Sequence, residues 1–287
     1  MIPTQAIITG LMSGALYALL ATGLIVAWHC ARVINLAHGE SYALAGLLAS
    51  LLRQAGLPIS VSVVAAICAA MALSLAVERL LLWPRRDWPA SSLILVTLAA
   101  AFLSRGMLYV VAGVDPLSFP RMFAGRPWHF ADGAWPRQGV ALILGGLLAS
   151  VGVVLFLRAS EPGRRLRAVA ENPDAAQLVG IDIRRARAIG FMIAGALGGL
   201  GAVLLVPLVS VDYQTGLAMT LRGFIAAALA GMSAPRAVLA GFALGLAEAL
   251  VTWRFGALAQ DPVVFLALIG LALWQGRRIS FGGRGRA

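Results

Sequence analysis

Apolar runs long enough to cross a lipid bilayer recur along this chain from one end to the other. A helix needs about 20 residues to cross the hydrocarbon layer, and in lipid every backbone N–H and C=O group must find its partner within the protein. Hydrophobic residues make up 60% of the sequence and charged residues 12%, whereas a soluble domain carries about 25% charged residues. Because strand-like alternation is absent, the sequence predicts an all-α, polytopic transmembrane helical bundle.

We count nine candidate membrane segments, within a range of about eight to ten, in a single transmembrane domain that covers residues 1–287. They are residues 5–27, 33–52, 58–82, 91–112, 139–157, 188–209, 217–232, 237–252 and 263–274. The segments at 217–232 and 263–274 are shorter than a full crossing. Their length predicts half-helices or re-entrant segments.

Arginine placement predicts how the segments are oriented. The net charge is +11, and the basic residues lie mainly in the loops and the tail, a placement that cytoplasmic retention of short loops explains better than nucleic-acid binding. The loop at 158–187 holds seven arginines and is predicted to face the cytoplasm, with the turns at 84–86 and 233–236 and the tail. The amino end and the loop at 113–137 are then expected on the opposite side.

Several chemistries are excluded by what the sequence lacks. All 23 basic residues are arginines, so neither a P-loop lysine nor a Schiff-base lysine is present. Cys30 and Cys68 have no spacing typical of a zinc site or a disulfide framework. The sequence also offers no paired aspartates, no Gly-x-Ser-x-Gly elbow and no His-Glu-x-x-His run. We therefore expect no metal, no cofactor and no enzymatic activity in this chain.

Polar side chains interrupt the second apolar segment, where they are rare unless they are functional. If residues 33–52 form one regular helix, Asn35, His38 and Tyr42 share a face, and Glu40 points nearly the opposite way. A break at Gly39 would relieve this conflict, because glycine lets the backbone leave the helix. The pattern predicts a distorted segment that lines a water-accessible translocation path. The alternative is that Asn35 and His38 only form hydrogen bonds between helices.

Small-residue stripes predict close helix packing. They occur as Gly10-x-x-x-Gly14, Gly195-x-x-x-Gly199 and Gly241-x-x-x-Gly245. Glu248 shares a helical face with the last of these stripes, so its carboxylate is expected to face the bundle interior or to pair with a cation there. Glu248 is therefore a further candidate for the translocation path.

Within the loop at 158–187, residues 171–180 predict a short helix with its own start and stop signals. Asn172 is the expected N-cap, Pro173 the first helical residue, Asp174 the acidic residue of the first turn, and Gly180 the residue just past the end. The arginine-rich flanks would hold this helix near an anionic membrane surface, where it could dock into a partner's groove. The alternative is an amphipathic linker without a partner.

The helix carries a recognisable pattern. The run Asp174-Ala175-Ala176-x-x-x-Gly180 is similar to the coupling-loop signature of bacterial ABC permeases, which forms the helix that contacts the ATPase. The resemblance implies an ATPase-coupling role for Glu171, Asn172, Asp174, Ala175, Ala176 and Gly180.

Motifs along nearly the whole chain resemble the branched-chain amino-acid ABC transporter permease family, specifically the Liv-type permeases. They include Gly10, Gly14, the run Tyr17-Ala18-Leu19, the run Arg32-Val33-Ile34-Asn35-Leu36-Ala37-His38-Gly39, Leu166-Arg167-Ala168, Gly180-Ile181-Asp182 and Gly245-Leu246-Ala247-Glu248. Leu36 and Asp174 depart from the Phe and Glu that are usual at these positions in the two signatures.

The resemblance implies a multi-pass permease subunit in the bacterial inner membrane. Its expected partners are a second homologous permease, two cytoplasmic ATPase subunits that bind the ATP, a periplasmic solute-binding protein and membrane lipid, but no nucleic acid. The expected solutes are branched-chain or related hydrophobic amino acids, with urea, amides and aromatic carboxylates as alternatives. A secondary transporter or channel would share the bundle but gives no reason for the capped helix between arginine clusters.

Overall fold

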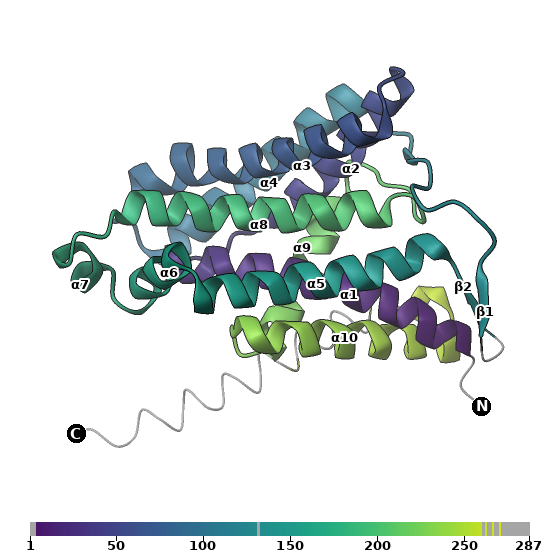
Figure 1. Cartoon of the computed structure of the whole chain (residues 1–287). Helices are drawn as coiled ribbons and strands as arrows, with labels where there is room; N and C mark the ends of the chain where they lie inside the picture. The colour runs from purple at the N-terminus through teal and green to yellow at the C-terminus, as the bar shows by residue number, and fades with distance from the viewer. Residues whose placement is uncertain (1–3, 131–132, 260–261, 263–265, 267–269, 271–287) are drawn as a thin grey trace.

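The computed structural model describes residues 4–130, 133–259, 262, 266 and 270 as a bundle of helices with one small β-hairpin (Figure 1). The elements, in chain order, are α1 (Thr4–Ala31), α2 (His38–Gln54), α3 (Ile59–Ala76), the π-helical turn η1 (Val77–Leu82), the 3-10 turn η2 (Trp83–Arg85), α4 (Ala90–Ala112), β1 (Trp128–Phe130), β2 (Gly133–Trp135), α5 (Arg137–Ala159), α6 (Glu161–Glu171), α7 (Pro173–Leu178), α8 (Ile183–Leu205), α9 (Thr215–Leu229), α10 (Ala234–Phe255) and the 3-10 turn η3 (Ala257–Ala259).

Helix α1 forms the centre of the bundle and packs against α5, α8, α9 and α10. The small-residue stripes make the closest approach possible. A Cβ atom added at Gly14 would lie 2.7 Å from the Cα of Phe242, and one added at Gly241 would collide with the backbone of Ala18. The stripe on α8 packs in the same way, because a Cβ at Gly199 would lie 3.0 Å from the Cβ of Ala70 on α3. The predicted close packing of the glycine stripes is therefore confirmed.

The predicted fold class is also confirmed. Six helices in the described part of the chain, counting α3 with its continuation to Arg85 as one, are long and apolar enough to cross a membrane. Helix α9 has 15 residues, and at about 1.5 Å per residue it falls short of a hydrocarbon layer about 30 Å thick. The prediction of a half-helix at 217–232 agrees with this length. The predicted segment at 263–274 lies largely outside the described residues.

The segment over 33–52 is not one regular helix, in agreement with the predicted distortion, but the break does not lie at Gly39, where the sequence analysis placed it. Helix α1 ends at Ala31, Arg32 adopts a positive φ of 55°, and α2 begins only at His38. The break therefore lies before Gly39 rather than at it. Side chains satisfy the backbone there, because Leu36 N donates to Thr97 Oγ1 at 3.1 Å, and backbone groups within a membrane need such partners.

The loop at 158–187 is more helical than predicted. Helix α6 was not predicted, although Ser160 is a regular N-cap whose Oγ accepts from Gly163 N at 3.0 Å. Helix α8 begins at Ile183 rather than at 188, because Asp182 Oδ1 accepts from Arg185 N and caps the helix five residues earlier. Three of the seven arginines that the sequence analysis assigned to a loop, Arg184, Arg185 and Arg187, thus lie at the start of α8.

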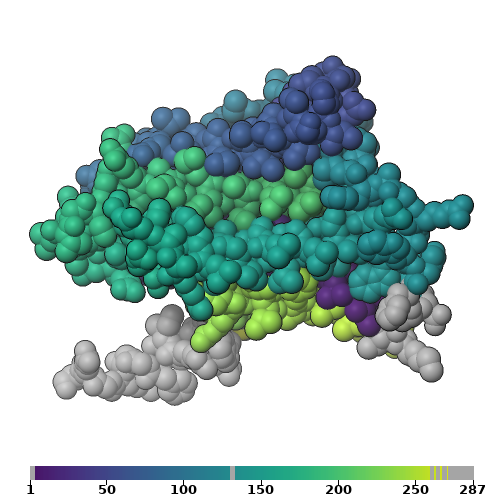
Figure 2. Space-filling view, in the orientation of Figure 1, coloured from purple at the N-terminus to yellow at the C-terminus, as the bar shows by residue number. Residues whose placement is uncertain are grey.

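The arginine-bearing turns gather at one end of the bundle, as their placement predicted. The guanidinium groups of Arg184 and Arg187 lie over the ring of Trp83, at 5.9 and 5.5 Å from its centroid. Arg158 and Pro235 line one cavity at this end. Thr4 and Ile8 pack near Gly133 at the opposite end, so the amino end shares a side with the hairpin. Figure 2, in the orientation of Figure 1, shows that the region of α7 projects beyond the rest of the bundle at this end.

Candidate functional site

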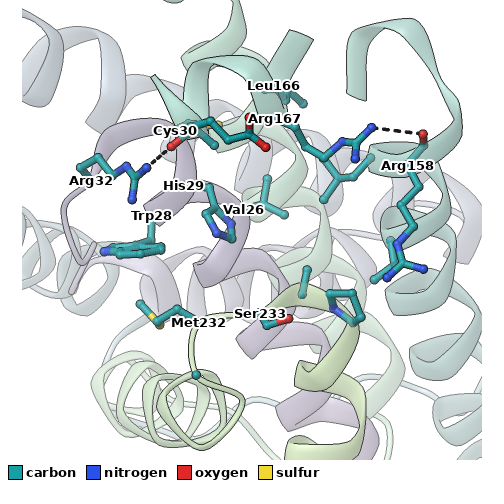
Figure 3. Close-up of a pocket in the computed structure, with 17 residues that line it drawn as sticks. Val26, Trp28, His29, Cys30, Arg32, Arg158, Leu166, Arg167, Met232 and Ser233 are labelled. Carbon is teal, nitrogen blue, oxygen red and sulfur yellow. Dashed lines mark hydrogen bonds between the residues drawn. The ribbon is translucent and has the colours of Figure 1, made fainter. Parts of the chain in front are cut away.

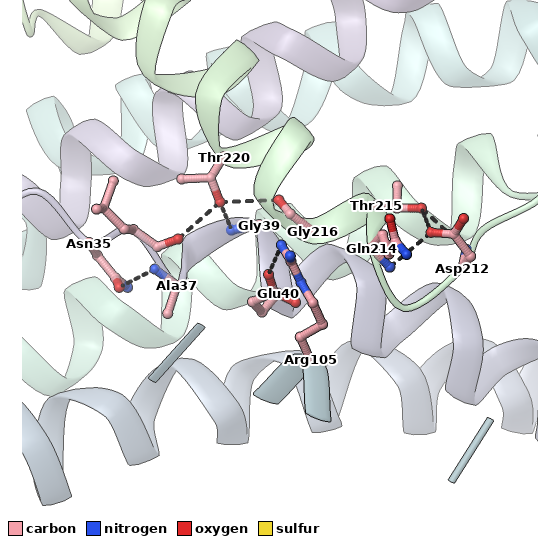
Figure 4. A network of polar contacts seen from close by, with 11 residues as sticks. Asn35, Ala37, Gly39, Glu40, Arg105, Asp212, Gln214, Thr215, Gly216 and Thr220 are labelled. Carbon is pink, nitrogen blue, oxygen red and sulfur yellow. Dashed lines mark hydrogen bonds and ion pairs between the residues drawn. The ribbon is translucent and has the colours of Figure 1, made fainter. Parts of the chain in front are cut away.

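The amino ends of α2 and α9 meet inside the bundle through a small polar network (Figure 4). Thr220 lies at the junction: its Oγ1 accepts from Gly39 N at 2.8 Å and can donate to the carbonyl of Leu36 at 3.2 Å. A Cβ atom at Gly39 would collide with the carbonyl of Gly216 and lie 2.6 Å from the backbone N of Thr220. Only glycine therefore allows the two helices to approach this closely.

Glu40 is fully buried at this junction and forms an ion pair with Arg105 of α4, at 3.7 Å between Oε1 and Nη2. Its carboxylate lies so close to Gly216, in the first turn of α9, that a Cβ atom there would collide with it. The amino end of a helix carries partial positive charge, so both neighbours stabilise the carboxylate. Asp212 organises the start of α9, because its Oδ1 accepts from Gln214 N at 2.9 Å.

Of the other three residues predicted in this segment, His38 and Tyr42 lie four residues apart on α2, as predicted, whereas Asn35 lies outside this helix. Asn35 precedes α2, and its Oδ1 accepts from Ala37 N at 3.0 Å. It therefore does not share the helical face with His38 and Tyr42 that one regular helix would have given it. The Nε2 atom of His38 lies 3.1 Å from the carbonyl of Leu20 on α1, which is an interhelical hydrogen bond of the kind that the alternative interpretation invoked. Tyr42 is buried in the main core cluster. Their role in translocation stays a prediction.

Glu248 faces the bundle interior, and the prediction that it pairs with a cation is confirmed. It is buried on α10, accepts from Arg222 Nε of α9 at 3.1 Å and accepts a hydrogen bond from the Tyr17 hydroxyl of α1. A cavity of about 300 Å³ between α1 and α10 reaches this carboxylate, with Thr9 and Ser13 among its lining residues. Of the five predicted path residues, Glu248 is the one that lines this cavity, whose surface is otherwise mostly apolar.

A further ion pair with both side chains buried joins α8 to η1, the continuation of α3. Arg187 donates to Glu78 through both Nε, at 2.8 Å, and Nη2, at 3.1 Å. Both side chains are buried. Bidentate pairs of this kind are geometrically specific, so the pair fixes the start of α8 against η1 at the arginine-bearing end.

Helix α7 confirms the predicted start and stop signals. The Oδ1 atom of Asn172 accepts from Ala175 N at 3.0 Å, Pro173 is the first residue, and Gly180 follows the end with a φ of +80°. The surface that α7 presents is apolar at its end, where Leu178 and Val179 are 89% and 75% exposed. An exposed pair of large apolar side chains outside the membrane helices suits contact with a partner.

The inner side of α7 is attached to the bundle. Ala176 is buried in an apolar cluster with Cys30 of α1 and Ala186 of α8, and Leu166 and Val169 of α6 complete this cluster. Ile181 N donates to the carbonyl of Ala176 at 3.0 Å, which closes the turn toward α8. A force applied to α7 would therefore reach three helices at once.

Sequence reasoning missed the partners of the buried acids. Arg105 and Arg222, the partners of Glu40 and Glu248, lie within predicted apolar segments, as does the missed acid Glu78, and a charge inside a membrane segment is itself a signal of a buried pair. Thr220 and Gly216 carried no such signal. Among the described residues, no group of three or more His, Cys, Asp and Glu side chains is placed to hold a metal ion.

Comparison with known proteins places this geometry in context. The high-affinity branched-chain amino acid transport system permease protein LivH of Escherichia coli (strain K12) is 29% identical over 282 residues, which cover 92% of this chain and 91% of LivH. The corresponding protein BraD of Pseudomonas aeruginosa is 29% identical over 289 residues, with 94% and 93% covered. PsaBC from Streptococcus pneumoniae, solved in complex with a Fab, has the same fold at a TM-score of 0.52 and 12% identity, with 92% of this chain and 89% of that chain covered.

The family model described as "Branched-chain amino acid transport system / permease component" matches residues 6–273. This span takes in the membrane helices, the two buried ion pairs and the capped helix α7. A match over nearly the whole length is consistent with the apolar bundle and with the residues that the sequence analysis singled out. The chain therefore belongs to the family of branched-chain amino acid transport system permease components.

Proposed function

We propose that this protein is the membrane-spanning subunit of an ABC importer in the bacterial inner membrane. Its solutes would be branched-chain or related hydrophobic amino acids, as the names of LivH and BraD indicate for those proteins. ATP would be bound and hydrolysed by separate subunits, because this lysine-free chain offers no P-loop lysine. The chain itself would hold no cofactor and catalyse no reaction.

The observation that carries this proposal is α7, a self-capped helix that presents Leu178 and Val179 to the outside. A secondary transporter or a passive channel has no need of such a helix. We propose that α7, with Glu171, Asn172, Asp174, Ala175, Ala176 and Gly180, docks into a groove of the ATPase. Two ATPase subunits, a second homologous permease and a periplasmic solute-binding protein would complete the transporter.

Closure of the ATPase pair would move α7 and, through it, the bundle. The apolar cluster around Ala176 connects α7 to α1, α6 and α8, and the Glu78–Arg187 pair connects α8 to η1 at the end of α3. ATP can shift the bundle between two states only if the ATPase holds α7 differently in each of them. The proposed mechanism is therefore a rigid connection from the cytoplasmic end to the centre of the membrane.

The cavity between α1 and α10, which the Glu248 carboxylate lines, is the part of the bundle that we propose borders the translocation path. It brings Thr9, Ser13 and the Glu248 carboxylate together within a membrane-spanning region, where polar groups are costly unless they serve a function. We propose Asn35, His38, Glu40 and Tyr42 as further path residues, which would reach the solute after the bundle has moved.

Replacing Glu248 by Gln is expected to lower solute uptake strongly while the ATPase still copurifies. The amide keeps the shape of the side chain but removes the charge beside Arg222, and a hydrogen bond to a charged group contributes about 1.5 to 3 kcal/mol. Uptake in vesicles and thermal unfolding in detergent measure the two effects. Glu161→Gln is the matched control, because that carboxylate is exposed on α6. Full activity and full stability of Glu248→Gln would contradict the path role.

Reconstitution tests the function itself. The permease would be inserted into proteoliposomes with the ATPases, second permease and binding protein encoded beside it, and uptake of leucine, isoleucine and valine compared with that of urea, a short amide and benzoate. We expect uptake of the branched-chain amino acids that requires hydrolysable ATP. Uptake that persists without ATP would indicate a secondary transporter or channel, and uptake of another solute would overturn the substrate assignment.

A further inference from the structure

A cavity of about 470 Å³ lies at the arginine-bearing end of the bundle, apart from the Glu248 cavity (Figure 3). Its walls come from the carboxyl ends of α1 and α5, from α6, and from the turn between α9 and α10. In Figure 3, Trp28 and His29 point into the space between α6 and that turn, where Met232 and Ser233 lie. The proposed transport mechanism uses one of its lining residues, Glu171 at the end of α6, and gives the cavity itself no role.

The cavity has an apolar interior and a basic rim. Val26, Val154 and Leu157 are among the apolar lining residues, and Arg32, Arg158 and Arg167 supply three positive charges. Glu171 is the one acidic residue in the lining. The cavity therefore suits a ligand with an anionic head and an apolar body.

The guanidinium groups of the three arginines have N–H donors that are available to such a ligand. Arg32 donates to the carbonyl of Ala170, and Arg167 donates to the carbonyl of Arg158 at 3.4 Å. In the part of the chain that the structure describes, none of the three forms an ion pair. A guanidinium carries several N–H donors and binds phosphate with particular geometric fit, so most of their capacity is unused.

Backbone strain is concentrated at this cavity. Among the described residues, Arg32, with a φ of 55°, and Met232, with a φ of 54°, are the two that combine a side chain with a positive φ, and both line the cavity. Such conformations cost about 1 to 3 kcal/mol and cluster at ligand clamps and active sites. The strain points to a site whose shape matters for function.

The depth of the cavity indicates where its ligand comes from. Helices α1 and α5 both meet the length and hydropathy needed to span a membrane, and the lining residues Trp28 and Arg158 lie within their last turn. The cavity is therefore at the level where the hydrocarbon layer ends and lipid headgroups begin. Tryptophan is typical of this boundary.

We propose that this cavity binds the headgroup of an anionic phospholipid. The phosphate would lie beside Arg158 and Arg167, which stand on the same side of the cavity in Figure 3, with Arg32 across from them, and the glycerol and the first methylene groups would contact the apolar interior. Basic pockets between membrane helices on the cytoplasmic side recognise headgroups of this kind. A bound headgroup would join α6 to α1 and α5 and so brace α7, which is attached to α6. The binding itself does not depend on which solute the transporter carries.

Native mass spectrometry of the purified full-length permease, with the partners that copurify with it, tests the proposal. Phosphatidylglycerol is the probe, added to protein held in a zwitterionic detergent. We expect retention by the parent protein and at least about tenfold weaker retention by Arg158→Gln/Arg167→Gln, because two charge-assisted contacts are lost. Arg164→Gln/Arg165→Gln is the matched control, since it removes the same charge from α6 at exposed residues outside the cavity.

Further measurements distinguish a lipid headgroup site from a free-anion site, from unspecific attraction and from a contact with the ATPase. Arg158→Lys/Arg167→Lys should restore part of the retention, and the lipid should raise the unfolding temperature of the parent protein but not of the glutamine variant. Displacement of the lipid by millimolar inorganic phosphate would overturn the proposal in favour of a free-anion site. Equal loss in the control variant would overturn it in favour of unspecific attraction. If the permease alone retains phosphatidylglycerol but the complex with the ATPase does not, the ATPase covers this cavity and the proposal is overturned.

Discussion

Replacing Leu178 by Asp is expected to abolish copurification of the ATPase subunits and, with it, ATP-driven uptake. Leu178 ends α7 with 89% of its surface exposed, so the permease alone loses little by the change. In the proposed complex the side chain is buried in a groove of the ATPase, where a leucine contributes about 1.5 to 3 kcal/mol and an unpaired carboxylate is strongly unfavourable. Binding should weaken at least about a hundredfold.

Affinity purification of the tagged permease measures this effect, with the ATPase content of the eluate as the readout. Leu178→Met is the matched control, because methionine keeps an apolar side chain of similar size and should retain the ATPase. Thermal unfolding should be the same for all three proteins. Normal ATPase content in Leu178→Asp would show that α7 is a linker without a partner, and the importer proposal would lose its structural support.

Replacing Glu78 by Ala should destabilise the protein by about 3 to 5 kcal/mol, because it leaves the Arg187 guanidinium buried without its bidentate partner. Both side chains are nine-tenths buried or more, so water cannot take the place of the lost carboxylate. Unfolding of the detergent-solubilised protein, followed by circular dichroism, provides the measurement. We also expect uptake to fall more than ATPase binding does, since the pair joins two membrane helices, α8 and the continuation of α3, and lies away from α7.

Two comparisons make this result specific. Glu161→Ala also removes one carboxylate from an ion pair with arginine, but the side chains of Glu161 and Arg165 are 64% and 62% exposed, so the loss should stay below about 1 kcal/mol. The double variant Glu78→Leu/Arg187→Leu should recover much of the stability, because neither charge is then left alone. If Glu78→Ala is as stable as the parent protein, water reaches this ion pair and the prediction is wrong.

Local features were predictable because the information lies within a few residues of the chain. Asn172, Pro173 and Gly180 specify α7 through a side-chain cap, a fixed φ and a left-handed backbone, none of which needs a distant partner. The inward orientation of Glu248 followed from its place on the glycine face of one helix. At residues 33–37, the apolar run predicted the start of a membrane helix, but tertiary contacts prevailed. The side chains of Thr97 and Thr220 form hydrogen bonds with the backbone of Leu36, which lies outside the helix.

The sequence by itself determined the membrane bundle, the end at which the arginine turns gather, and the capped helix α7, because apolar length, charge placement and capping act locally. Tertiary structure alone decided which cation pairs with which buried acid. Arg105, Arg187 and Arg222 lie 65, 109 and 26 residues from Glu40, Glu78 and Glu248, so no helical period relates them. These pairs exist because packed helices exclude water, and a buried charge then requires a partner from whichever helix lies beside it.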